Sequence, residues 1–75
     1  MMKELILDGS TFIALCDILK KTGMCESGGH AKAMIDEGKV KVDGNVELRK
    51  RCQIVANQVV EYEGQSVKVL VKELE

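Results

Sequence analysis

Seventy-five residues suffice for one domain, over residues 1–75, but not for a deep active-site cavity, because a chain this short buries only about 60% of its unfolded surface. An apolar fraction of 45% supports a core and excludes a disordered chain. The net charge of −1 excludes a wholly basic protein that coats nucleic acid, yet residues 39–51 hold five Lys or Arg against two acids. This distribution predicts a local basic patch on a mildly acidic body.

A first strand is predicted over residues 3–7 and a first helix over residues 11–21. In the strand, leucine and isoleucine alternate between the two faces. The helix is expected to begin at Ser10 or Thr11, because either hydroxyl can accept a hydrogen bond from a free N–H one turn on. Its apolar stripe, at helical spacing, consists of Phe12, Leu15, Cys16, Ile18 and Leu19. Gly23 marks the end of this helix.

A second helix is predicted over residues 28–37, so that the two helices form a hairpin. Ser27 is a favourable N-cap, and Gly38 suits the left-handed conformation that ends a helix. Gly28 and Gly29 open this helix at a cost of about 1 kcal/mol each relative to alanine. Two explanations stay open. The glycines allow close packing against the first helix, or they let a phosphate approach the bare N–H groups of the helix end.

The periodicity changes from 3.6 to 2 after Gly38 and predicts a basic hairpin. Asp43-Gly44 or Gly44-Asn45 forms its turn, because these residues tolerate positive φ. In its first strand Val40 and Val42 face one side, and Lys39 and Lys41 face the other. In its second strand Val46 and Leu48 alternate with Glu47 and Arg49 in the same way. Lys50-Arg51 continue into a further turn.

The remaining residues are predicted to complete a small sheet. Cys52, Ile54 and Val55 return the chain to the core, and Ala56-Asn57-Gln58 forms a turn. Strands follow over residues 59–62 and 67–72 and are joined by a turn at Gly64-Gln65. In the second of these strands Val67, Val69 and Val71 lie on one face. The last residues, 72–75, are expected to fray. We therefore expect an α+β fold in which a two-helix hairpin packs on one side of a small, twisted, mostly antiparallel sheet.

The run Arg49-Lys50-Arg51 is the strongest candidate for a binding site. Three adjacent cations repel one another, and guanidinium groups can hold a phosphate through two donors. If the hairpin forms as predicted, this run shares one surface with Lys39, Lys41 and, from the second helix, Lys32. Taken alone, the alternation of lysine and valine also fits a solvated strand face. The pair Lys20-Lys21 suits the negative end of the first helix, so we expect it to matter less for binding.

Neither catalysis nor metal binding is predicted. The carboxylates form no convincing catalytic pair, and the Gly-x-x-x-x-Gly-Lys-Ser/Thr phosphate loop is absent. A zinc site from His30 and the cysteines lacks the spacing of a structural zinc module, and Cys16 and Cys52 are placed toward the core. His30, the one histidine, is either an exposed first-turn residue or a contact to nucleic acid.

Cysteine spacing, hydropathy and aromatic content restrict the cellular compartment and the kind of ligand that we expect. Cys16, Cys25 and Cys52 show no C-x-x-C spacing, and no apolar run is long enough to span a bilayer or to act as a signal peptide. These features predict free thiols, no membrane partner and a cytoplasmic location. One Phe and one Tyr weigh against recognition of single strands on an aromatic platform.

Taken together, the motifs resemble the alpha-L RNA-binding domain, the module named after small-subunit ribosomal protein S-four, and most of all its small stand-alone bacterial members. The matching features cover nearly the whole chain: Leu19-Lys20 before Gly23, Ser27-Gly28-Gly29-x-Ala31-Lys32, Ile35-x-x-Gly38, Val40-x-Val42-x-Gly44 and Glu47-x-Arg49-Lys50-Arg51. Many members of the wider family carry an arginine after the serine, where this chain has Gly28. The stand-alone members resemble this chain in having two glycines there.

The resemblance implies a monomeric module that docks on structured RNA, ribosomal or ribosome-associated, without a cofactor and without chemistry of its own. The residues expected to contact RNA are Ser27, Gly28, Gly29, His30, Lys32, Lys39, Lys41, Arg49, Lys50 and Arg51. The alternative is a protein-interaction adaptor that uses an exposed strand edge or the helix hairpin. A DNA-binding module is a third, weaker interpretation.

Overall fold

The computed structural model describes residues 2–9 and 11–71, and within these residues the chain forms two helices and seven strands. In chain order the elements are β1 (Met2–Leu7), β2 (Phe12–Ala14), α1 (Leu15–Lys21), α2 (Gly28–Asp36), β3 (Val40–Val42), β4 (Asn45–Val46), β5 (Gln53–Val55), β6 (Val59–Tyr62) and β7 (Gln65–Val71). One sheet has the order β1-β7-β6-β3-β4, with β1 parallel to β7 and all other neighbours antiparallel. β2 and β5 pair as a separate antiparallel ribbon.

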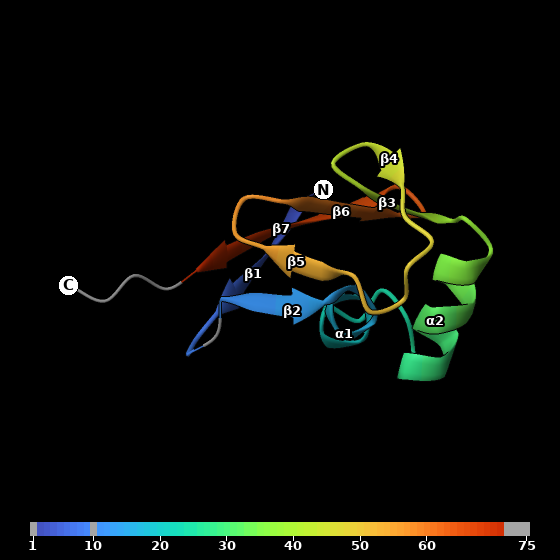
Figure 1. The fold of residues 1–75 in the computed structure, drawn as a ribbon, viewed down its shortest axis with the longest axis horizontal. Helices are drawn as coiled ribbons and strands as arrows, with labels where there is room; N and C mark the ends of the chain where they lie inside the picture. Colours follow the sequence, from blue (N-terminus) through green and yellow to red (C-terminus); the bar gives the residue numbers. More distant parts are fainter. Residues whose placement is uncertain (1, 10, 72–75) are drawn as a thin grey trace.

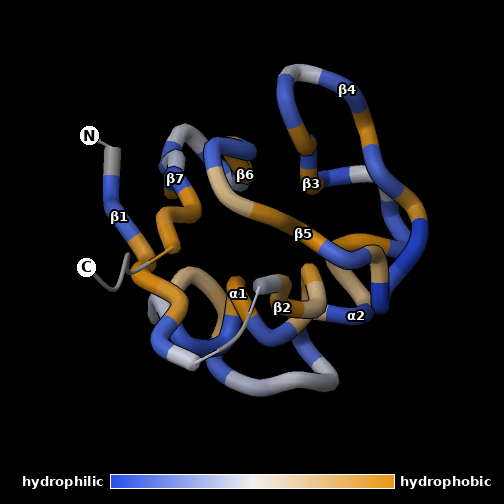
Figure 2. The backbone as a smooth tube through the Cα atoms, turned by 60° about the vertical axis from the view of Figure 1, so that its left-hand side comes forward, coloured by the Kyte–Doolittle hydropathy of each residue, from blue (hydrophilic) through white to orange (hydrophobic). Residues whose placement is uncertain are grey.

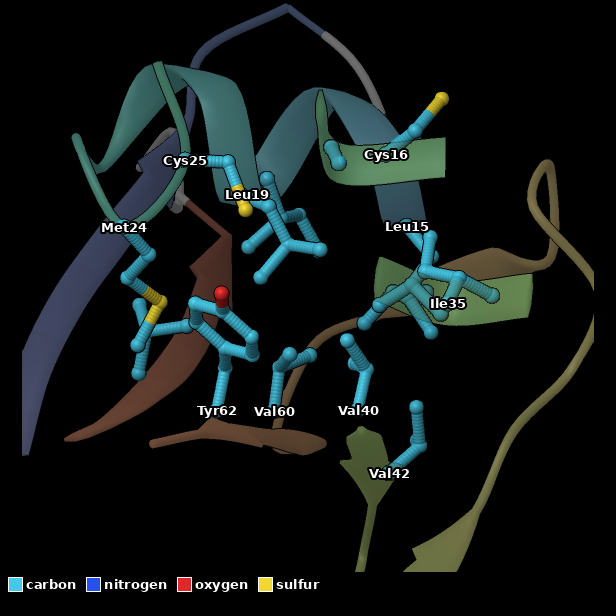
Figure 3. Close-up of a cluster of buried hydrophobic side chains, with 14 of the residues drawn as sticks. Leu15, Cys16, Leu19, Met24, Cys25, Ile35, Val40, Val42, Val60 and Tyr62 are labelled. Atoms are coloured by element: carbon cyan, nitrogen blue, oxygen red, sulfur yellow. The ribbon is translucent and has the colours of Figure 1, made fainter. Parts of the chain in front are cut away.

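Both helices lie on the same side of the larger sheet and form the predicted hairpin (Figure 1). Figure 3 shows side chains of α1 and α2 pointing toward those of β3 and β6. The fully buried large side chains are Leu15, Ile18, Leu19, Ile35, Val40, Ile54, Val60, Val67 and Val69. Burial contributes about 1.5–3 kcal/mol for each such side chain, which fastens the helices to the sheet. The predicted α+β architecture is confirmed. Neither helix in the described part of the chain has the length and apolarity needed to cross a membrane.

The first helix is shorter than predicted, because Phe12–Ala14 forms a strand in place of its first turns. This strand pairs with Gln53–Val55, a segment far away in the sequence. Phe12, expected in the apolar stripe, is therefore 42% exposed, whereas the other predicted stripe residues are buried. A local sequence pattern cannot show this pairing, because phenylalanine and isoleucine are as favourable in a strand as in a helix stripe.

Backbone groups cap α1, in place of the hydroxyl that we expected. The N–H groups of Leu15 and Cys16 donate to the carbonyl oxygens of Cys52 and Lys50, at 2.9 and 3.2 Å. No side chain caps the helix at Ala14, so Thr11 does not have its predicted role, and Ser10 lies outside the described residues. The start of α1 is thus a point of attachment for a distant loop.

The second strand of the hairpin ends earlier than predicted. The turn at Asp43-Gly44 is confirmed, with φ of 51° and 85°, but β4 pairs with β3 only as far as Val46. In the same register Arg49 would stand opposite Gly38, which has the left-handed φ of 76° that ends α2 and cannot continue a strand. The chain therefore leaves the sheet. The same register places Val46 opposite Lys41, on the face away from Val40 and Val42, and Leu48 would follow on that outer face. Val46 and Leu48 are accordingly 52% and 59% exposed.

The C-terminal half matches the prediction with small changes. Ile54 is fully buried, but its neighbour Val55 is 46% exposed on the opposite side of β5 and is not a core residue. A turn forms at Asn57, with a φ of 74°, as predicted. The turn from β6 to β7 lies one residue earlier than predicted, at Glu63-Gly64, where both φ values are positive. The expected fraying concerned residues 72–75, which lie outside the described residues.

Candidate nucleic-acid interface

Residues 47–52, called here the basic loop, are fixed to the fold at both ends. The N–H of Glu47 donates to the carbonyl oxygen of Val40 at 3.1 Å, which continues the β3–β4 ladder by one bond. At the other end the carbonyl oxygens of Lys50 and Cys52 cap α1. Figure 2 shows the loop, hydrophilic over most of its length, passing alongside α2 on its way from β4 to β5. The predicted basic run therefore lies in a loop that is anchored at both ends.

Arg49 and Glu47 form a bidentate ion pair. The Arg49 Nε and Nη2 atoms donate to the two carboxylate oxygens at 3.0 and 3.2 Å, and the Arg49 N–H donates to the same carboxylate at 3.0 Å. These bonds lower the pKa of Glu47 from its ordinary value of 4.5 to about 2. Glu47 had no predicted role, because alternation placed it on an ordinary strand face. It fixes both the loop backbone and the direction of the guanidinium.

The other loop cations differ in the partners they have. Lys50 Nζ lies 3.9 Å from the carboxylate of Asp36 on α2, a long and exposed pair that contributes little energy. The side chain of Arg51 is exposed and makes no hydrogen bond or ion pair with residues 2–9 or 11–71. Arg51 is therefore the loop residue whose charge is fully available to a ligand.

The lysines of β3 do not join the loop on one strand face, as we had predicted. Lys41 points to the sheet face opposite the helices, where its neighbours on adjacent strands are Glu61 and Val46. Lys39 precedes β3 and pairs with Glu37 at 3.4 Å. Lys32 lies on α2 one helical turn before Asp36, which contacts Lys50 of the loop. The Asp36–Lys50 contact links α2 to the loop, and we call the residues Gly28, Gly29 and Lys32 of α2 together with Arg49, Lys50 and Arg51 of the loop the α2–loop face.

The start of α2 is open to solvent. A Cβ atom added at Gly28 would meet no atom within 4 Å, and one at Gly29 would meet only the Ser27 Oγ, at 3.9 Å. Close packing against the first helix therefore does not explain these glycines. The first N–H groups of a helix have no partner within it and carry partial positive charge, so an anion can approach them here.

Ser27 caps α2, and the ring of His30 accepts a hydrogen bond from the residue before Ser27. The Ser27 Oγ accepts from the His30 N–H at 3.1 Å, and the His30 Nδ1 accepts from the Glu26 N–H at 3.2 Å. The predicted N-cap is confirmed. Because Nδ1 is an acceptor, the proton of the neutral ring lies on Nε2, which is the atom left for a ligand.

The three cysteines lie in different surroundings and are unpaired. Cys16 and Cys25 are buried, whereas Cys52 is half-buried at the end of the basic loop, with its Sγ 3.6 Å from both Glu47 and Arg49. Partial burial, followed by the charge of Glu47, raises the pKa of the Cys52 thiol. Among residues 2–9 and 11–71, His, Cys, Asp and Glu form no cluster suited to a metal ion.

A compact domain with a helix hairpin, a small sheet and a local cluster of cations in an anchored loop has the features expected of a nucleic-acid-binding module. Comparison with known proteins makes this class specific. Residues 6–70 match the S4 domain, and the chain belongs to this family. The resemblance noted from the sequence motifs is confirmed.

Two curated relatives are similar over most of their length. The chain is 59% identical over 58 residues to the Escherichia coli (strain K12) protein named "Putative RNA-binding protein YbcJ", and the match spans 77% of this chain and 83% of that protein. The YbcJ protein of Shigella flexneri gives the same values. The solution structure of Escherichia coli YbcJ, described as revealing an αL motif involved in RNA binding, matches with a TM-score of 0.72 and 51% identity. That match covers 93% of this chain and 89% of the other.

Proposed function

We propose that this protein binds structured RNA through the α2–loop face, as a monomer and without a chemical step, and that its target is ribosomal RNA. Membership of the S4 domain family and the αL motif described for the Escherichia coli relative support RNA as the ligand. The observation that carries the proposal for the site is the anchored basic loop beside the open start of α2. Arg51 of this loop and Lys32 of α2 form no ion pair within the described residues, and the N–H groups of Gly28 and Gly29 open the same helix.

Recognition on this face depends on phosphates and shape more than on base edges. The charged groups stand on the outside of a helix and on a loop, where they can meet phosphates, and phosphate contacts carry no sequence information directly. Lys39 and Lys41 join the contact only if the RNA wraps around the edge of the sheet at β4, because Lys41 faces the other side. The RNA site thus consists of a core at the α2–loop face and an extension at β3.

Binding of labelled total ribosomal RNA, compared with total transfer RNA and duplex DNA at one fixed salt concentration, tests the ligand class. We expect the order ribosomal RNA, transfer RNA, DNA. In cell extracts we expect the protein to sediment with ribosomal particles and to be released by nuclease. Sedimentation with a protein complex that resists nuclease would contradict the proposal and support the adaptor function.

The dependence of affinity on salt counts the cations involved. If five basic side chains meet phosphates, log K should fall against log salt with a slope of roughly −3.5 to −4.5. If only the unpaired cations Lys32, Lys41 and Arg51 do so, the slope should be roughly −2 to −3. A flat response with binding retained would show that phosphates are not the main contact.

A further inference from the structure

A cleft between β1, β2 and α1 adjoins the α2–loop face at Arg51. Its volume is about 560 Å³, within the range of small-molecule sites. The apolar part of its lining consists of Leu5, Ile6, Leu7, Phe12, Ile13 and Ala14. The polar part consists of Asp8, Asp17, Lys21, Arg51 and Gln53.

The apolar wall exposes the one Phe or Tyr ring that is available to a ligand. The chain contains one Phe and one Tyr, and Tyr62 is only 4% exposed in the core. Phe12 is 42% exposed and Ile6 60% exposed, and both line the cleft. A flat, unpaired base can stack on such a ring whatever its identity, because every base has a π-face.

Four of the five polar side chains have no partner among the described residues. The side chains of Asp17, Lys21, Arg51 and Gln53 make no hydrogen bond or ion pair within the described residues. An apolar protein segment placed in the cleft would remove these groups from water without giving them partners, at a considerable cost. A nucleotide supplies a phosphate for the two cations and base-edge donors and acceptors for Asp17 and Gln53.

The cleft is continuous with the α2–loop face. A second hollow, of about 520 Å³, is lined by Arg49, Arg51, Cys52 and Gln53. Arg51 and Gln53 line both hollows, so they stand at the boundary between them. An RNA strand that leaves the α2–loop face past Arg51 therefore reaches the cleft directly.

We propose that this cleft takes one unpaired nucleotide of the bound RNA, with its base against Phe12 and Ile6 and its phosphate between Arg51 and Lys21. This inference rests on the proposed RNA-binding function and adds a preference for RNA with a bulged or looped-out nucleotide. It also gives Lys21 a role that its position at the helix end did not predict.

Two labelled RNA hairpins test the proposal: one with a single 2-aminopurine bulge, and one with the same stem fully paired. The wild-type protein should bind the bulged hairpin about 5- to 150-fold more tightly, the range expected from stacking one base on an aromatic side chain. It should also change the 2-aminopurine fluorescence. Phe12→Leu keeps the apolar bulk but not the ring, and it should lose this preference while affinity for the paired hairpin stays unchanged.

Val55→Ala is the matched control, because Val55 is the cross-strand partner of Phe12, is exposed and does not line the cleft. It should leave the preference intact. Equal affinity of the wild type for both hairpins, or equal losses for both in Phe12→Leu, would overturn the cleft proposal while RNA binding itself stands. No binding of either hairpin would count against the proposed function and the cleft proposal together.

A second measurement does not depend on the choice of hairpin. In a ¹⁵N-labelled sample, adenosine 5′-monophosphate at millimolar concentration should shift the amide signals of residues 12–21 and of Gln53, and Phe12→Leu should weaken these shifts. Shifts confined to the α2–loop face would overturn the proposal. So would self-association that depends on Phe12, because a second copy of the chain would then occupy the cleft.

Discussion

Two regions of this molecule carry three cations each, and the positions of these cations are determined in different ways. Lys32, Lys39 and Lys41 lie on or beside α2 and β3, where short-range structure fixes their directions. The basic loop carries the run Arg49-Lys50-Arg51 and has no regular structure of its own. Backbone hydrogen bonds to β3 and α1 hold it in place. The number of cations is the same, but the loop depends on the whole fold for its shape.

The same comparison shows that counting cations overstates the charge available to a ligand. In the loop, Arg49 is engaged by Glu47 and Lys50 approaches Asp36, which leaves Arg51. In the helix and strand region Lys39 pairs with Glu37. Each region therefore contains cations that have an acidic partner and cations that have none. Substitutions can separate the effects of the two kinds.

The largest expected effect comes from removing the anchor of the loop. Ile54 is fully buried directly after the basic loop, on the strand that pairs with β2. Ile54→Ala should lower the free energy of unfolding by about 2–5 kcal/mol, because it leaves a cavity in the core. Urea titration monitored by circular dichroism measures this change.

Val55→Ala is the control for this substitution, since its side chain is 46% exposed on the other side of the same strand. It should stay within about 0.5 kcal/mol of the wild type. Equal destabilisation by the two substitutions would mean that β5 does not have the observed inside and outside faces.

The next effect separates an unpaired cation from a paired one. Arg51→Ala should weaken binding to ribosomal RNA by about 10- to 100-fold, the value of a charge-assisted contact, and should reduce the salt slope by about one. Lys39→Ala should do less, because Glu37 already shares its charge. Both side chains are exposed, so thermal melts should match the wild type within about 0.5 kcal/mol. A stronger loss for Lys39→Ala would shift the RNA toward β3.

Acid unfolding tests the Glu47–Arg49 pair. The pKa of Glu47 is lowered to about 2 in the folded protein, from an ordinary value of 4.5. Its stabilising contribution is therefore complete above about pH 4.5 and is lost as the pH falls toward 2. Glu47→Gln should be less stable than the wild type at neutral pH, and the difference between the two should disappear near pH 2. A difference that is independent of pH would show that the charge of Glu47 is not what holds Arg49.

The smallest effect concerns the thiols. Cys52 is half-buried, whereas Cys16 and Cys25 are buried, so iodoacetamide should modify Cys52 first. The reaction should be slow at neutral pH, because partial burial and Glu47 raise the pKa of Cys52 and the thiolate is the reactive form. Mass spectrometry of the peptides gives the order, and faster modification of Cys25 would mean that the α1–α2 connection opens readily.

Those parts of the fold that depend on neighbours in the chain were determined by the sequence itself. Ser27 and Gly38 mark the two ends of α2, because capping is a property of a few adjacent residues. Asp43-Gly44 made a tight turn for the same reason. The alternation of Val40 and Val42 with Lys41 placed the valines in the core and the lysine outside. The combined spacing of these motifs was also enough to indicate the S4 domain family.

Tertiary structure alone decided where residues with two acceptable environments went. Phe12 suited a helix stripe as well as a strand, and pairing with Val55 settled it as an exposed strand residue. Leu48 and Arg49 continued a strand pattern, but Gly38, on the opposing segment, could not extend the ladder. The partner of each cation likewise depended on contacts between distant segments, as for Lys50 and Asp36. Local patterns record the preferences of a residue, and only the folded chain shows which backbone or charge stands opposite it.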